Sequence, residues 1–391
     1  MRRSLHGLVT LAWSLACAAV QAQAPDADGW QYEAGRGLRH EAAGLTLGGY
    51  VTGELQKPSN DSSQARISHV SVFLWWEPTD ALKVFGEIDQ ENVVARVRER
   101  GRFEDRAERR ASLERLYATW TIDDALVLRG GKFLTPVGRW NQRHADPLTW
   151  TPSRPLLTRT VHPQNVTGVM ASGTLTPAGQ PLEYALYASN GAEWAPDPRQ
   201  DLFSTVRGLR AVLPVGAAWQ FGVSYARYEQ RGSREPRELQ GADLRWAAAG
   251  WEVSAEWLRT AAVNPAPPFG PGGGGGFGTT GNPFGGGGTF TTAAVVPGPA
   301  PLPRDPGTPP LALPTQGAWV QAVAPLWPQW FAVVRVERVR DTSSVDKVRQ
   351  DTAGLVWRPT AMVTLKLERQ HTRGRSDLAA DAWAMSASVL F

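Results

Sequence analysis

Cysteine is almost absent from this sequence: Cys17 is the only one among 391 residues. It lies in an N-terminal segment that we expect to be removed, which excludes a disulfide framework, a thiolate nucleophile and a cysteine metal site. No apolar run reaches the roughly 18 residues that a transmembrane helix needs, so helical membrane spans are excluded as well. The formal net charge is only +4. This small charge excludes a strongly basic nucleic-acid-binding protein.

The N-terminus has the organisation of a secretory signal peptide. Two arginines precede an apolar stretch over 8–20, and small residues that suit a signal peptidase follow it. The alternative is a lipoprotein signal acylated at Cys17, but the usual leucine three positions before the cysteine is missing. We therefore predict a signal peptide at 1–22 and an exported chain in which 23–42 form a periplasmic N-terminal tail.

Beyond the tail, apolar and polar residues alternate with a period of two, which is typical of strands with two different faces. In 81–89, Leu82 and Val84 lie on one face. Lys83 and Glu87 lie on the opposite face. Such segments run for about 10 residues, the length of a strand that crosses a bilayer at a tilt. They number about 16. Their expected starts are near residues 44, 66, 81, 112, 125, 168, 181, 204, 217, 237, 250, 317, 330, 347, 362 and 380.

Short and long connections alternate between these segments. Tight turns such as 77–80 and 358–360 are separated by longer connections such as 90–111, 134–167 and 262–316. A closed barrel with one rim of short turns and one rim of long loops predicts this alternation, whereas a soluble sandwich does not.

Tryptophan gathers close to the short turns. Amphipathic indoles prefer the headgroup level of a membrane, so this placement predicts an aromatic girdle at one rim. The alternative, a soluble β-protein with tryptophan in its core, would not collect these residues at one kind of turn. The tryptophans concerned are Trp76, Trp120, Trp219, Trp246, Trp251, Trp327, Trp330 and Trp357.

The chain ends with an alternating segment, 382–391, whose last residue is Phe391. This ending resembles the terminal strand of bacterial outer-membrane barrels. Together with the exported chain, it predicts an all-β protein in the bacterial outer membrane, a transmembrane antiparallel β-barrel of about 16 strands over 43–391.

Residues 128–144 (LRGGKFLTPVGRWNQRH) resemble the segment of bacterial porins in which the fifth strand leads into the third loop. The likeness is closest to the group that includes the phosphate-selective porins O and P. The third loop of such porins folds into the lumen and narrows it. The resemblance therefore implies an inward-folded constriction loop at 134–167, passive transport without a cofactor, and assembly as a homotrimer.

The predicted constriction loop is basic, and Asp146 is its only acidic residue. Guanidinium groups in a confined lumen attract anions because low-dielectric walls focus the electric field. Arginine also suits phosphate and carboxylate through its planar donors. Alternatively, several of these arginines pair with wall carboxylates and only shape the loop. The basic residues are Arg139, Arg143, His144, Arg154, Arg159 and His162.

Strand alternation places both signs of charge on the inner face of the wall. This mixed wall differs from the one-sided arginine ladder of the phosphate-selective porins. We therefore predict a pore for small hydrophilic solutes with a weak preference for anions. The predicted lumen-wall residues are Lys83, Glu87, Arg115, Arg129, Arg210, Arg245, Arg335, Glu337, Lys366 and Glu368.

Two further segments have unusual compositions. Residues 96–115 interleave arginine with acidic residues, which suits either an extracellular loop facing lipopolysaccharide phosphates or a solvated charged hairpin. Residues 262–316 are rich in glycine and proline, which predicts a disordered extracellular loop.

Two other functions are weighed against a porin. An outer-membrane hydrolase needs a nucleophile beside a base, and His69 and Ser71 on one strand face come nearest, without an evident acid. The motifs HExxH and GxSxG and any metal-ligand spacing are absent, so the sequence predicts no enzyme, no metal site and no cofactor. A structural or adhesin barrel would need an ordered extracellular domain, for which 262–316 is the only candidate.

Overall fold

A computed structural model describes most of the chain. The described residues are 29–59, 62–99, 102–106, 110–143, 145–161, 164–189, 191, 194, 203–230, 236–263, 315–341, 347–374 and 380–391. The predicted signal peptide at 1–22 lies outside them. Of the predicted loop at 262–316, only 262–263 and 315–316 are described. Among the described residues, no helix is both long and apolar enough to cross a membrane.

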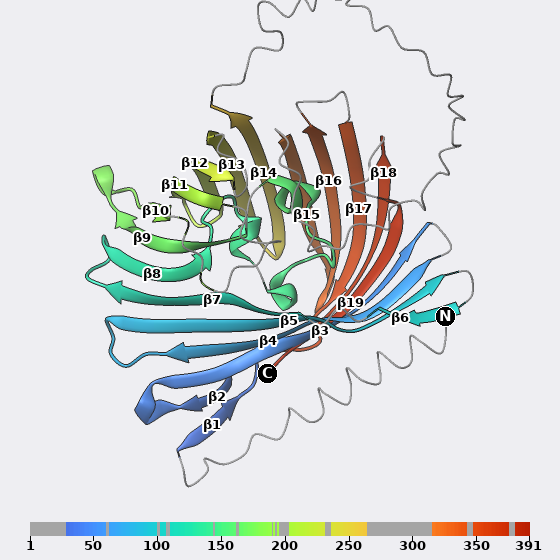
Figure 1. Ribbon diagram of the computed structural model, residues 1–391, viewed down its shortest axis with the longest axis horizontal. Helices are drawn as coiled ribbons and strands as arrows, with labels where there is room; N and C mark the ends of the chain where they lie inside the picture. Colours follow the sequence, from blue (N-terminus) through green and yellow to red (C-terminus); the bar gives the residue numbers. More distant parts are fainter. Residues whose placement is uncertain are drawn as a thin grey trace, which may run out of the picture.

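Nineteen strands of the described chain form one sheet, and sixteen of them close into an antiparallel barrel (Figure 1). Consecutive barrel strands pair with each other, and the last strand pairs with the first from Leu390↔Tyr50 to Ala382↔Pro58. This confirms the predicted all-β barrel of about 16 strands. The barrel strands are β3 (Leu45–Pro58), β4 (Ser63–Trp76), β5 (Leu82–Glu99), β7 (Arg110–Thr121), β8 (Val127–Leu134), β9 (Asn165–Leu175), β10 (Leu182–Ser189), β11 (Phe203–Val215), β12 (Trp219–Gln230), β13 (Pro236–Ala248), β14 (Trp251–Ala262), β15 (Thr315–Trp327), β16 (Trp330–Asp341), β17 (Lys347–Trp357), β18 (Val363–Arg373) and β19 (Ala382–Leu390).

The predicted strand starts agree closely with the observed ones. The largest differences are three residues, at Ser63 against the predicted 66 and at Asn165 against the predicted 168. Period-two alternation locates a strand well because its two faces meet different surroundings.

A hairpin precedes the barrel where the sequence suggested only a tail. It consists of β1 (Trp30–Glu33) and β2 (Gly37–His40), and β2 extends the sheet by pairing with the start of β3 at Leu38↔Leu47. The 3-10 helix η1 (Glu41–Ala43) then leads into β3. These strands have four residues each, too few for the alternation to be recognised in the sequence.

A second hairpin forms at the end of β5, beyond its last pair with β7, Glu91↔Arg110. The short strand β6 (Arg102–Asp105) folds back on the end of β5, and Arg96 forms an ion pair with Asp105 at 2.9 Å. Arg106 pairs with Glu104 at 3.1 Å. Part of the positive charge of this segment is therefore neutralised within the hairpin.

The two faces of the barrel wall differ in chemistry. On β15, Val320 points outward and is 51% exposed, while Trp319 and Gln321 on either side point inward and are 1% exposed. Other strands repeat this alternation, with apolar side chains outside and many polar ones inside. The exposed apolar residues include Val72, Ile88, Val169, Leu186, Val223 and Val334. An apolar outer band is the surface that a transmembrane barrel presents to lipid.

Aromatic rings line the short-turn ends of the strands. Trp330 and Trp357, on neighbouring strands, stack with their ring centroids 5.4 Å apart. Trp219 and Trp246, also on neighbouring strands, have tilted rings with centroids 6.2 Å apart. Trp120 and Trp327 are largely exposed at other short turns. This ring of indoles occupies the positions expected for the interfacial girdle of a barrel.

The outer face of β15 allows a prediction of how the cost of an introduced charge depends on its depth in the membrane. Val320→Arg, near the middle of β15, should lower the free energy of unfolding by about 2–4 kcal/mol because it places a charge in hydrocarbon. Leu326→Arg lies on the same face beside the short turn and should cost only about 0–1 kcal/mol. Urea titration of the protein folded in lipid vesicles measures both, and equal costs would contradict a membrane-spanning β15.

Candidate functional site

The segment between β8 and β9, residues 135–164, lies against strands on the other side of the barrel. We call it the interior segment. It carries the 3-10 helices η2 (Trp140–Gln142) and η3 (Asp146–Leu148) and the helix α2 (Leu156–Val161), which Figure 1 shows within the curve of the sheet. The sequence placed this loop at 134–167.

The first contact of the interior segment is with β12 and β14. The backbone N–H groups of Arg139 and Trp140 donate to one oxygen of Glu256, at 2.8 and 3.2 Å. The N–H of Gly138 donates to Ser224 Oγ at 3.2 Å. Gly138 has a positive φ of 61°, and a Cβ there would collide with the Glu256 carboxylate. The positive φ favours glycine, and a side chain here would displace the Glu256 carboxylate.

The second contact is with a buried ion pair on β16. Arg335 and Glu337 are both 0% exposed, with 2.7 Å between Nε and Oε1. The other Glu337 oxygen accepts the backbone N–H of Leu156 at 2.6 Å. Arg335 donates to Thr151 Oγ1 at 2.6 Å and to Ser153 Oγ at 2.8 Å. Buried charges are tolerated when they are paired and fully hydrogen-bonded, and here the partners belong to the interior segment.

The third contact is with β18. The ammonium of Lys366 donates to the carbonyl of Asp146 at 2.5 Å and to Thr149 Oγ1 at 2.7 Å. Thr364 Oγ1 donates to the carbonyl of Pro147 at 3.2 Å. Lys366, predicted as a lumen-wall charge, therefore holds the backbone of the interior segment in place.

Apolar packing completes these contacts. Part of the inner face of the wall is apolar where the interior segment covers it. The rings of Trp140 and Trp319 meet edge to face with their centroids 5.8 Å apart. Burial beneath the segment removes these positions from water, so apolar residues are favoured there. The segment contributes Val137, Trp140, Leu156 and Leu157 to this buried apolar cluster, and the wall residues of the cluster include Leu239, Leu258, Trp319 and Val339.

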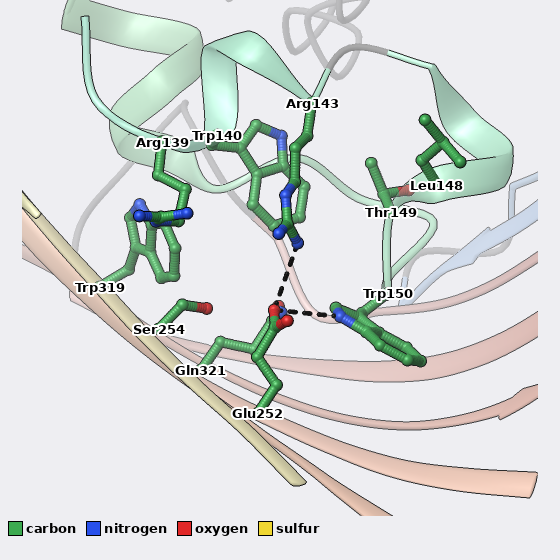
Figure 2. A pocket seen from close by; sticks show the side chains of 10 residues that line it. All are labelled: Arg139, Trp140, Arg143, Leu148, Thr149, Trp150, Glu252, Ser254, Trp319 and Gln321. Atoms are coloured by element: carbon green, nitrogen blue, oxygen red, sulfur yellow. Dashed lines mark hydrogen bonds and ion pairs between the residues drawn. The ribbon is translucent and has the colours of Figure 1, made fainter. Parts of the chain in front are cut away.

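Two of the predicted constriction arginines face wall carboxylates. Arg139 Nε lies 3.5 Å from Asp243 Oδ1. Arg143 Nη1 lies 3.3 Å from Glu252 Oε1, which also accepts the indole N–H of Trp150 at 3.3 Å (Figure 2). Both arginines therefore have the wall partners that the alternative interpretation of the loop required.

Each of these carboxylates also binds an arginine of the wall. Arg210 donates to both Asp243 oxygens, at 2.6 and 3.0 Å. Arg245 lies 2.9 Å from Glu252. We call the two sets the paired-arginine clusters: Arg139–Asp243–Arg210 and Arg143–Glu252–Arg245. In each cluster two guanidinium groups share one carboxylate, so the three groups together carry a formal charge of +1.

The other predicted loop bases contribute less to this arrangement. Arg154 donates to Gln164 Oε1 at 2.8 Å, within the interior segment. Arg159 belongs to α2, and only its backbone is described. His144 and His162 lie outside the described residues.

The remaining predicted wall residues have different surroundings. Arg115 and the buried Glu87 form an ion pair at 2.5 Å. Lys83 pairs with Glu77 at an exposed short turn, 2.9 Å apart. Glu368 is buried and accepts a hydrogen bond from Gln370.

Arg129 differs from these, because no described carboxylate forms an ion pair with it. Its guanidinium carbon lies 4.2 Å from the centroid of the Tyr117 ring, and its Nε donates to Thr119.

A cavity of about 420 Å³ lies between the interior segment and the inner face of β7–β11. Its charged lining consists of Arg115, Arg129, Arg210 and Glu183. A much smaller space of about 20 Å³ lies beside Glu252 (Figure 2), enough for one water molecule but not for a solute. The larger cavity is therefore the candidate path for a solute.

The histidine and serine noted in the sequence share an acid that sequence reasoning did not find. His69 Nδ1 lies 2.8 Å from Asp89 Oδ2, and Ser71 Oγ donates to Asp89 Oδ1 at 2.7 Å. The carboxylate stands between the other two groups, so the serine proton is directed to Asp89 and not to a histidine base. In a nucleophile–base pair the serine hydroxyl would have to donate directly to the histidine. Asp89 lies on the neighbouring strand, and its inward position in the alternation was the available signal.

The ion pair beneath α2 generates a stability prediction. Glu337→Gln should lower the free energy of unfolding by about 3–5 kcal/mol because it leaves the buried Arg335 without a counter-charge. The matched control is Asp351→Asn, which breaks a pair of the same spacing on β17 with side chains 39% and 28% exposed. That change should cost about 0–1 kcal/mol. Urea unfolding followed by tryptophan fluorescence compares them, and similar costs would show that the interior segment does not depend on Glu337.

Comparison with known proteins identifies the fold. No family profile matches the chain, and neither does any curated protein sequence. The anion-selective porin from Comamonas acidovorans superposes with a TM-score of 0.55 and 11% identity, over 89% of this chain and 99% of that one. OmpF of Salmonella typhi, in a complex with daunomycin, gives 0.56 and 10%, over 89% and 97%. The outer-membrane channel DcaP of Acinetobacter baumannii gives 0.53 and 10%, over 95% and 100%. The chain therefore has the barrel fold of outer-membrane porins.

Proposed function

We propose that this protein is an outer-membrane porin through which small hydrophilic solutes diffuse passively. The observation that carries the proposal is the closed barrel with an apolar outer face, a charged inner face and a long segment bound across its interior. The outer face of such a barrel contacts lipid, and its inner face contacts water. The fold shared with solved porins supports the same function, and neither the fold nor the proposed transport needs an energy source or a cofactor.

We further propose that the pore prefers anions weakly. Both paired-arginine clusters keep one positive charge each, and the larger cavity is lined by three arginines and one carboxylate. A confined positive potential concentrates anions. The likeness of 128–144 to the phosphate-selective porins makes phosphate the first anion to compare with chloride. The preference is weak because most of these arginines are paired, which limits their field.

We further propose two kinds of partner. The resemblance to porins implies a homotrimer, and the charged composition of 96–115 suggests that the β5–β6 hairpin meets lipopolysaccharide. The exposed Arg98, whose guanidinium carbon lies 5.6 Å from the centroid of the Phe103 ring, leaves a basic group at the hairpin surface. Chemical cross-linking in outer-membrane vesicles tests the trimer directly.

The proposed function is tested in a planar bilayer across a KCl gradient. Insertion of the folded protein should give stepwise conductance, with a reversal potential on the anion side. Arg129→Gln should move this potential toward cation preference because it removes a lumen charge that has no described carboxylate partner. Arg338→Gln is the control, since Arg338 is exposed on the outer face.

Three results would contradict the proposal in different ways. The absence of conductance would reject the pore itself. Cation preference in the unaltered protein would reject the anion preference. Equal shifts in Arg129→Gln and Arg338→Gln would show that the lumen position of the charge is not what matters.

A further inference from the structure

A cluster of possible metal ligands lies on the inner wall, apart from the paired-arginine clusters. One ligand atom each from His69, Asp89 and Glu91 lies within 4.8 Å of the others. No other group of this kind occurs in the part of the chain that the structure describes. His69 belongs to β4, and the two acids belong to β5.

A regular stretch of the ladder between β4 and β5 brings these side chains together, because His69 pairs directly with Glu91 and Ser71 with Asp89. The ladder shifts register just beyond this stretch, between Ile67 and His69. Asn92, the next residue, has a φ of +48°, a conformation that few residues other than glycine adopt. Bulges of this kind redirect side chains and are frequent at functional positions. Here the regular pairing sets two carboxylates against the same imidazole, and the bulge follows directly after Glu91.

A carboxylate lies beside each ring nitrogen of His69. Asp89 Oδ2 lies 2.8 Å from His69 Nδ1, while Asp146 Oδ2 of the interior segment lies 3.9 Å from His69 Nε2. A ligating histidine commonly directs its second ring nitrogen to a carboxylate, which fixes the ring. Ser71 holds the other Asp89 oxygen at 2.7 Å. The carboxylate of Glu91 forms no hydrogen bond or ion pair with any described residue, so it is available as a ligand.

We propose that His69, Asp89 and Glu91 bind a divalent transition-metal cation of the zinc class. His69 supplies Nδ1, the two acids supply one oxygen each, and Asp146 positions the ring through Nε2. The imidazole favours zinc over magnesium or calcium, which prefer oxygen ligands alone. Three protein ligands leave a fourth position for water or an anion. The ligands come from two strands, which explains why no motif revealed the site in the sequence.

The site would join the interior segment to the barrel wall. A bound cation adds two positive charges to a region where three carboxylates surround one imidazole. It also orders His69 against Asp146. If the proposed pore function is correct, zinc should therefore move the reversal potential toward anions. This consequence rests on the proposed function, whereas the binding itself does not.

Calorimetric titration tests the site on the full chain folded in detergent and stripped of metal with a chelator. Zinc chloride should bind with a stoichiometry of one per chain. His69→Ala should abolish this binding, and Glu91→Gln should weaken it at least about tenfold while preserving the shape of the side chain. Asp146→Asn, which removes only the positioning group, should weaken it by about 10–100-fold.

The matched control is His371→Ala. His371 also contacts an aspartate, with 3.0 Å between its Nδ1 and Asp381 Oδ2, but belongs to no such cluster. Its loss should leave zinc binding unchanged. The proposal is overturned if the unaltered protein binds no zinc, or if Glu91→Gln and His69→Ala bind it as tightly as His371→Ala does.

The test also separates the two proposals. A protein that conducts ions but binds no zinc retains its proposed function and loses only the metal site. A protein that binds one zinc per chain but does not conduct keeps the site, and only the pore is rejected.

Discussion

The pairing of β19 with β3 is the constraint on which the rest of the structure depends. In hydrocarbon, an unpaired strand edge exposes backbone N–H and C=O groups at a cost of several kcal/mol each, so a sheet can cross a bilayer only when it closes. Nine residue pairs, from Leu390↔Tyr50 to Ala382↔Pro58, achieve this closure. Once the barrel is closed, every strand has one face toward lipid and one toward the lumen. The alternation along each strand then places apolar side chains outside and many polar ones inside.

Inside the barrel, charged side chains of the wall fix the backbone of the interior segment. Glu256 and Glu337 accept backbone N–H groups of the interior segment, and Lys366 donates to one of its carbonyls. These contacts are made away from bulk water, where a charged hydrogen bond is strong and an unpaired charge is costly. The interior segment therefore has a defined position although it contains only short helical turns. Its apolar side chains cover Leu258 and other wall residues, and so form a small core within the barrel.

Ion pairing between side chains also determines how much of the charge in the lumen a solute can sense. Asp243 and Glu252 are each shared by two arginines, so the charge that remains in each cluster is smaller than the number of guanidinium groups suggests. Arg129 instead lies over an aromatic ring and keeps its charge. The acidic wall around His69 forms a second and separate electrostatic region. Selectivity therefore follows from which charges are paired across the lumen and not from their number in the loop.

The sequence by itself determined the strand positions, the barrel class and the presence of a long basic connection after β8. Alternation with a period of two is a local pattern, so it can be recognised without knowing which strands are neighbours. Only the tertiary structure decided that Arg139 meets Asp243, that Leu239 and Leu258 are covered, and that Asp89 lies between His69 and Ser71. These contacts join residues far apart in the chain or on different strands. They depend on barrel closure, on the register between neighbouring strands and on the path of the interior segment, none of which has a local signature.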